Sequence, residues 1–105
     1  MYHLIYCTCP DLETAEQIAR QLVSDKLAAC VNILPGVSSI YQWQDEIEAA
    51  QEHLLLIKSQ QARYAAIEAA IKVMHPYQVP EIIAVAIDNG SKEYLQWIDS
   101  CLSTH

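Results

Sequence analysis

The sequence predicts an α+β protein in which helices cover one antiparallel β-sheet. Three observations support this fold class. Apolar, β-branched and aromatic residues form four strand-like segments, amphipathic helical patterns follow three of them, and turn residues mark the boundaries. The predicted order is therefore βαββαβ with an additional C-terminal helix. With 105 residues, 52% of them hydrophobic, the chain is expected to form a single domain over residues 1–105 with its own core.

The chain is expected to begin with a strand and a helix. Residues 2–9 are mostly apolar, aromatic or β-branched, and Pro10 ends that strand. Asp11 suits the helix N-cap, because its carboxylate can accept from unpaired backbone N–H groups. The helix is expected to continue to about Lys26. Its apolar residues recur at helical spacing: Ala15, Ile18, Ala19, Leu22 and Val23.

The middle of the sequence predicts a long hairpin. Residues 29–43 favour a strand, and Pro35 with Gly36 indicates a kink or bulge within it. The polar residues 44–46 suit a turn. From Ile47 the chain is then expected to return antiparallel, ending in the apolar run 54–57.

A second helix–strand unit and a last helix complete the pattern. Ser59 is expected to cap a helix that stops before Pro76. The apolar stripe of this helix consists of Tyr64, Ile67, Ile71 and Met74. Residues 81–88 form another apolar strand, residues 89–90 form a turn, and Ser91 is expected to cap the final helix.

This order predicts the ferredoxin-like βαββαβ sandwich, with a long central hairpin and both crossover helices on one face of the sheet. The strands at 54–57 and 82–87 are apolar on both faces. Their helix-free sides would therefore form a large exposed apolar patch. A second copy of the chain is the simplest cover, so the sequence predicts a homo-oligomer.

The charge distribution argues against some partners. The formal net charge is −7, and the six Lys and Arg residues are scattered, so nucleic acid and anionic membranes are not expected partners. No apolar run reaches the roughly 18 residues of a membrane helix. The N-terminal segment lacks the basic region of a signal peptide. We therefore expect a cytoplasmic protein whose four cysteines stay reduced.

Three segments resemble the CutA divalent-cation-tolerance family. They are residues 26–43 (KLAACVNILPGVSSIYQW), 75–82 (HPYQVPEI) and 94–98 (YLQWI). Their order and spacing match the family over nearly the whole chain. The resemblance implies a tight, PII-like homotrimer of ferredoxin-like subunits, with long hairpins that extend across neighbouring subunits. It also implies binding of copper or other divalent cations, and it brings no established catalytic activity.

The resemblance also implies a metal site. Cys7 lies where the family has a metal-associated cysteine, and a thiolate suits Cu(I). The alternative is a buried cysteine that packs as a small hydrophobe. His75 matches the metal-associated histidine, and its alternative role is to cap the preceding helix. Cys9 lies outside the motif, but it faces the same side as Cys7, and two such thiols can chelate one soft ion.

Two further residues complete the candidate metal ligands. Met74 stands where some members have a second histidine. Its thioether suits Cu(I) but is a poor ligand for Cu(II) or Zn(II), and core packing is its alternative role. Glu81 matches a glutamate of the family motif. It could ligate a metal, orient His75 through a hydrogen bond, or be an ordinary acid at a strand start.

We therefore predict a trimeric protein that buffers or senses copper or another divalent cation. One alternative is a PII-like trimeric signalling or adaptor protein that binds a small molecule or protein partner at inter-subunit clefts. Another is a scaffold whose main property is stability. An enzyme is not expected, because no nucleophile–base pair is evident. The two glycines, Gly36 and Gly90, do not form a phosphate-binding loop.

Overall fold

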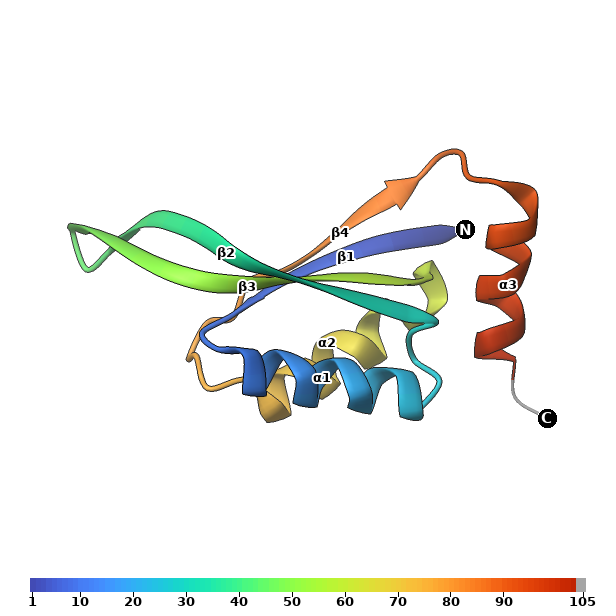
Figure 1. Cartoon of the computed structure of the whole chain (residues 1–105), viewed down its shortest axis with the longest axis horizontal. Helices are drawn as coiled ribbons and strands as arrows, with labels where there is room; N and C mark the ends of the chain where they lie inside the picture. Colours follow the sequence, from blue (N-terminus) through green and yellow to red (C-terminus); the bar gives the residue numbers. More distant parts are fainter. Residues whose placement is uncertain (104–105) are drawn as a thin grey trace.

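The computed structural model describes residues 1–103, and these form a four-stranded antiparallel sheet with three helices. The strand order is β2-β3-β1-β4. The strands are β1 (Tyr2–Cys9), β2 (Cys30–Trp43), β3 (Glu46–Gln60) and β4 (Ile82–Ile87). The helices are α1 (Leu12–Ser24), α2 (Tyr64–Met74) and α3 (Lys92–Leu102), and a short 3₁₀ helix, η1 (Gln61–Arg63), precedes α2. Both α1 and α2 lie on one face of the sheet, so the predicted ferredoxin-like arrangement is confirmed (Figure 1).

The main core lies between that face and the two helices. Side chains alternate along β1, and Ile5, Cys7 and Cys9 are fully buried toward α1 and α2. Leu55 and Ile57 of β3 lie beside them in register. The helices contribute Ala15, Ile18, Leu22, Ile67 and Ile71. The apolar stripes predicted for both helices therefore face the sheet.

Two of the three predicted helix caps are present. The Asp11 carboxylate accepts from the Thr14 N–H at 2.7 Å, and the Ser91 hydroxyl accepts from the Tyr94 N–H at 3.1 Å. The predicted Ser59 cap is wrong. Ser59 still belongs to β3, and its hydroxyl donates to the Leu27 carbonyl oxygen at 2.6 Å.

The misplaced cap has a physical reason. Ser59 pairs with His3 of β1, so the strand continues past the residues that looked like its end. Pairing with a central strand outweighs the local preference of serine for a helix start. The turn through Gln61–Arg63 then leads into α2, whose N-cap residue Arg63 makes no side-chain capping bond.

The β2–β3 hairpin extends beyond the body of the sheet (Figure 1). Its turn has two residues rather than the predicted three, because Glu46 already pairs with Trp43. Gln44 and Asp45 at the tip have positive φ values of 51° and 65°. The predicted interruption of the first hairpin strand is present as a register shift between Leu34 and Val37. The arm gives the molecule its long dimension of 47 Å.

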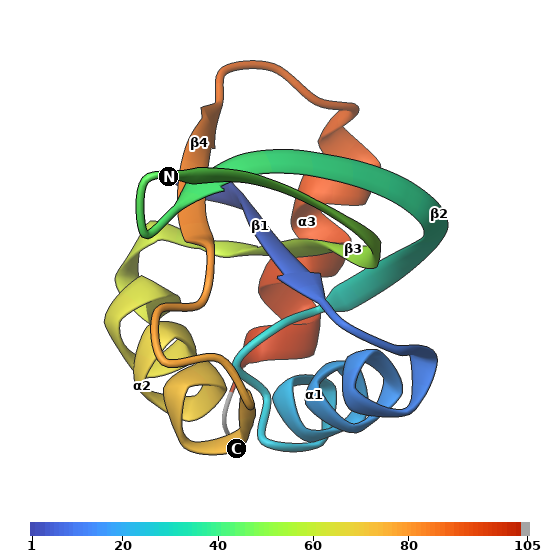
Figure 2. The same cartoon turned by 90° about the vertical axis from the view of Figure 1, so that its left-hand side faces the viewer.

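The opposite face of the sheet is apolar and only partly covered. Helix α3 packs over one end of it, where the Tyr2 hydroxyl and the Gln60 amide both donate to the Asp99 carboxylate at 2.7 Å. Figure 2, in which the hairpin points toward the viewer, shows α3 behind it, at the end of the molecule opposite the hairpin tip. The uncovered part includes Ile83 and Val85, which are 52% and 50% exposed. The exposed apolar face expected from the sequence is therefore present.

Within the described part of the chain, no helix has both the length and the apolar character to cross a lipid bilayer.

Candidate metal centre

Three potential ligands meet where β1 ends and α2 ends. The thiols of Cys7 and Cys9 and the imidazole of His75 are buried, and their ligand atoms all lie within 4.8 Å of one another. The two thiols share a face because they are two positions apart on a strand. His75 follows the last residue of α2 in an extended conformation, with φ −79° and ψ 135°. Pro76 favours that conformation, so the chain leaves the helix toward β1.

Both ring nitrogens of His75 already have partners. The Tyr77 backbone N–H donates to Nδ1 at 3.1 Å, so Nδ1 must carry a lone pair. Nε2 then carries the proton and donates to the Thr8 carbonyl oxygen at 2.7 Å. The network therefore selects one neutral tautomer. To bind a metal, His75 would have to give up one of these two hydrogen bonds.

The two thiols interact strongly with each other. A hydrogen bond between them lowers the pKa of Cys9 and raises the pKa of Cys7. Burial raises the pKa of Cys7 further, because an apolar environment disfavours the thiolate. The pair therefore strongly disfavours loss of the Cys7 proton. A soft cation in place of that proton would bind both sulfurs.

The size of the group suits one ion. A metal–sulfur bond is about 2.3 Å long, so two sulfurs on one ion lie at most about 4.6 Å apart. The ligand atoms of Cys7, Cys9 and His75 all lie within 4.8 Å of one another, which is close to this value. Two thiolates with one imidazole favour soft ions such as Cu(I) over hard ions such as Mg²⁺. The arrangement can therefore bind a soft metal with little backbone movement.

Of the other two predicted ligands, Glu81 lies outside this group, whereas Met74 packs against the core cluster that contains Cys7 and Cys9. Met74 is half-buried and packs against the main core, so its core-packing alternative describes its place in the structure. Glu81 is exposed, immediately before β4, and it lines a hollow on the other side of the sheet. It does not orient His75, because the two ring nitrogens bond to Thr8 and Tyr77. His75 is the C-cap residue of α2, as its alternative role required, but it caps through its backbone N–H, which donates to the Ile71 carbonyl oxygen, and not through its ring.

Sequence reasoning assigned no role to one residue beside the thiols. His53 of β3 pairs directly with Cys9 of β1, so both side chains lie on the helix-covered face. Its Nδ1 is buried and has no hydrogen-bond partner among the described residues. The alternation of side chains along a strand is enough to predict from the sequence that Cys9 lies beside Cys7. The position of His53 beside Cys9 could not be predicted, because it depends on the pairing register of β1 and β3.

The fold and the buried thiol–imidazole group together define a class: a small ferredoxin-like protein with a compact site suited to a soft metal. The model of the CutA1 divalent ion tolerance protein family matches residues 3–101. A relative from Thermus thermophilus, named divalent-cation tolerance protein CutA, is 46% identical over 98 residues, which cover 93% of this chain and 95% of that one. The chain belongs to the CutA1 divalent ion tolerance protein family.

Structural similarity agrees with the sequence matches. A solved structure described as the periplasmic divalent cation tolerance protein CutA from Archaeoglobus fulgidus has a TM-score of 0.96 and 44% identity, covering 98% of this chain and all of that one. The human protein CutA is 42% identical over 93 residues, which cover 89% of this chain and 52% of the human protein. The predicted family and fold are thereby confirmed.

Proposed function

We propose that this chain is a divalent-cation tolerance protein that acts by binding copper, or another thiophilic cation, at Cys7, Cys9 and His75. The observation that carries the proposal is the meeting of three buried ligand atoms within 4.8 Å. Family membership supports the link to divalent cations, because relatives across bacteria and archaea carry that name. Copper is favoured within that class because two of the three ligands are soft sulfur atoms.

The two thiols are the primary ligands in this proposal. The metal would replace the proton that the two thiols share, and apart from that bond the Cys7 sulfur makes only a long contact of 3.9 Å to the Thr8 carbonyl oxygen. His75 is a secondary ligand, since its ring is held by Thr8 and Tyr77. Removing either thiol should therefore weaken binding more than removing the imidazole does.

The working assembly is proposed to be a homotrimer. The uncovered sheet face presents apolar side chains in register across three strands, with Tyr6 of β1 between Leu56 of β3 and Ile83 of β4. Such a face is stable in water only when another surface covers it. A closed ring of identical subunits buries the same face in every copy.

The protein is further proposed to bind rather than to catalyse. A general base needs a free lone pair near a nucleophile, and the lone pair of His75 already accepts from Tyr77. The site also requires reduced thiols, which favours a reducing compartment such as the cytoplasm. The Archaeoglobus fulgidus relative, in contrast, is described as periplasmic.

The test is an anaerobic Cu(I) titration of the purified protein against a competing chromophoric chelator. Wild type is expected to bind about one ion per chain with a Kd well below micromolar. Cys7→Ser and Cys9→Ser should each lower the affinity at least about a hundredfold, since each removes one of two soft ligands. His75→Gln should lower it less than either. Zn²⁺ titrations run in parallel would show whether a divalent ion competes.

The matched control is Cys101→Ser, which removes a half-buried thiol of α3 outside the group. It should leave the titration unchanged. If Cys7→Ser and Cys9→Ser bind Cu(I) as tightly as wild type and Cys101→Ser, these thiols are not the site and the proposal fails.

A further inference from the structure

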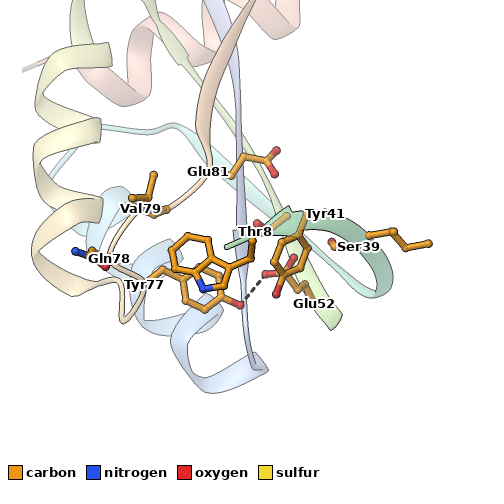
Figure 3. Close-up of a pocket in the computed structure, with 11 residues that line it drawn as sticks. Thr8, Ser39, Tyr41, Glu52, Tyr77, Gln78, Val79 and Glu81 are labelled. Atoms are coloured by element: carbon orange, nitrogen blue, oxygen red, sulfur yellow. Dashed lines mark hydrogen bonds between the residues drawn. The ribbon is translucent and has the colours of Figure 1, made fainter. Parts of the chain in front are cut away.

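A hollow of about 610 Å³ lies along the long hairpin. It is lined by parts of β1, β2, β3 and the segment between α2 and β4 (Figure 3). The polar and aromatic side chains that matter here are Thr8, Tyr41, Trp43, Glu52, Tyr77 and Glu81. Because Thr8 alternates with Cys7 and Cys9 along β1, the hollow lies on the opposite face of the sheet from the thiols. The hollow nevertheless adjoins the metal centre, because Thr8 and Tyr77 line the hollow and also hold the two ring nitrogens of His75.

The central feature of this hollow is the carboxylate of Glu52. Glu52 is only 5% exposed, and it accepts one hydrogen bond, from the Tyr77 hydroxyl at 2.8 Å (Figure 3). Among the described residues it has no ion pair, since the one salt bridge found joins Lys72 and Glu68. A carboxylate without a counter-ion attracts a cation, and this attraction is stronger where the protein excludes part of the surrounding water.

The charges around the hollow have one sign. Glu81 adds a second carboxylate at its edge, while its lining contains no lysine, arginine or histidine. Phosphates, carboxylates and other anions would meet repulsion without a compensating partner. The lining therefore selects for a positively charged occupant.

Aromatic rings make up much of the remaining wall. Tyr41, Trp43 and Tyr77 line the hollow, and in the single chain they keep 44%, 47% and 38% of their surface exposed. The faces of such rings attract organic cations, with tryptophan the strongest. Rings offer no oxygen ligands to a hard inorganic ion, which needs six or more oxygens around it. A hollow of this volume also suits a small molecule better than a bare ion.

The hydroxyl of Tyr77 maintains this arrangement. Its pKa is raised, first by burial and then by the hydrogen bond to Glu52, so it stays protonated at neutral pH. The ring therefore remains an uncharged π surface while its hydroxyl fixes one oxygen of Glu52. The other carboxylate oxygen has no hydrogen-bond partner among residues 1–103 and is available to an occupant.

We propose that this hollow binds a small organic ammonium cation, with Glu52 as its counter-ion and Tyr41, Trp43 and Tyr77 as aromatic walls. Glu81 attracts the cation at the entrance. This site uses side chains other than the three metal ligands, and it would give the protein a second, small-molecule ligand. Because the hollow borders the uncovered sheet face, binding is expected to depend on the native assembly.

The test compares two probes of matched shape by calorimetric titration of the assembled protein. The first is choline, and the second is neohexanol, in which a carbon atom replaces the charged nitrogen. Choline is expected to bind at least about tenfold more tightly than the alcohol, because only the cation interacts with the carboxylate and with the ring quadrupoles. Equal binding of the two probes, or no binding of either, would overturn the proposal.

The variants are Glu52→Gln and Trp43→Leu, with Trp97→Leu as the control. Trp97 is 44% exposed but lies on α3, away from the hollow. The first two changes should each weaken choline binding about tenfold or more, and the control should not. Trp43→Leu alters an exposed side chain, so it keeps the test valid if Glu52→Gln disturbs folding. Unchanged choline binding in both Glu52→Gln and Trp43→Leu would also refute the proposal.

Two further measurements separate this site from others. Cys7→Ser should bind choline as wild type does, so failure of the copper proposal and failure of this one remain distinguishable. Mn²⁺ is the probe for an inorganic site. If Mn²⁺ binds in a Glu52-dependent manner and choline does not compete with it, the hollow is an inorganic cation site and the proposal is wrong.

Discussion

The imidazole of His75 donates from Nε2 to the carbonyl oxygen of Thr8 at 2.7 Å, across 67 residues of chain. This bond joins the end of α2 to the end of β1, and Thr8 lies between the two thiols. His75, the nitrogen ligand proposed for the metal, therefore also holds two elements of the fold together. Its two roles compete, because a metal-bound nitrogen cannot keep its proton and its hydrogen bond.

His75→Ala should lower the free energy of unfolding by about 1–3 kcal/mol, because a buried carbonyl oxygen loses its partner. The measurement is equilibrium denaturation without metal, at one fixed protein concentration, since assembly makes stability concentration-dependent. Val73→Ala is the control, because Val73 lies on the same helix and is 86% exposed. If His75→Ala were no less stable than Val73→Ala, the bond to Thr8 would have no structural role.

Local features of the structure were predictable where the responsible residues are near in sequence. Asp11 and Ser91 cap helices as expected, since each bonds to an N–H group three residues later. The burial of Cys7 with Cys9 on one face followed from strand alternation. These predictions needed no knowledge of tertiary contacts.

Features set by distant partners were not predictable. Ser59 looked like a cap, but its pairing with His3 extends the strand instead. The fixed tautomer of His75 depends on Thr8, and the place of His53 depends on its register with Cys9. No local pattern encodes a register between strands this far apart. The candidate metal centre was therefore recognised in part, through its family motif, while its hydrogen bonding required the structure.

Gly36 provides a test of the hairpin geometry. It has φ of +74° at the bulge of β2, and an added Cβ would meet no atom within 4 Å. Any cost of Gly36→Ala therefore comes from backbone strain, and stability should fall by about 1–2 kcal/mol. Gly36→Asn should cost less, because asparagine tolerates positive φ. Thermal denaturation of the three proteins gives the order; an alanine variant as stable as wild type would contradict the strained conformation.

Asp99 should make the docking of α3 sensitive to acid. Hydrogen bonds from Tyr2 and then Gln60 hold the pKa of its carboxyl below the ordinary value of 3.8. Because the folded pKa is lower than the unfolded one, the stabilisation is fully present above the unfolded value and is lost as the pH falls through the folded value.

The measurement is the melting temperature of wild type and Asp99→Asn between about pH 7 and about pH 2. The wild-type advantage should be largest near neutrality and should disappear at the acid end. Asp88→Asn, at the end of β4, controls for loss of one negative charge. A difference between wild type and Asp99→Asn that is independent of pH would show that ionisation of this carboxyl is not responsible.

The uncovered sheet face gives the last prediction, which concerns assembly. Val85 lies on β4 opposite Leu4 of β1, and it is 50% exposed in the single chain. If a neighbouring copy covers this face, Val85→Lys would bury an unpaired charge, which is strongly unfavourable. Light scattering coupled to size exclusion should then show a trimer for wild type and mostly smaller species for Val85→Lys. Val73→Lys places the same charge on the exposed surface of α2 and should remain trimeric. A trimeric Val85→Lys variant would mean that the subunits meet elsewhere and that the apolar face serves another partner.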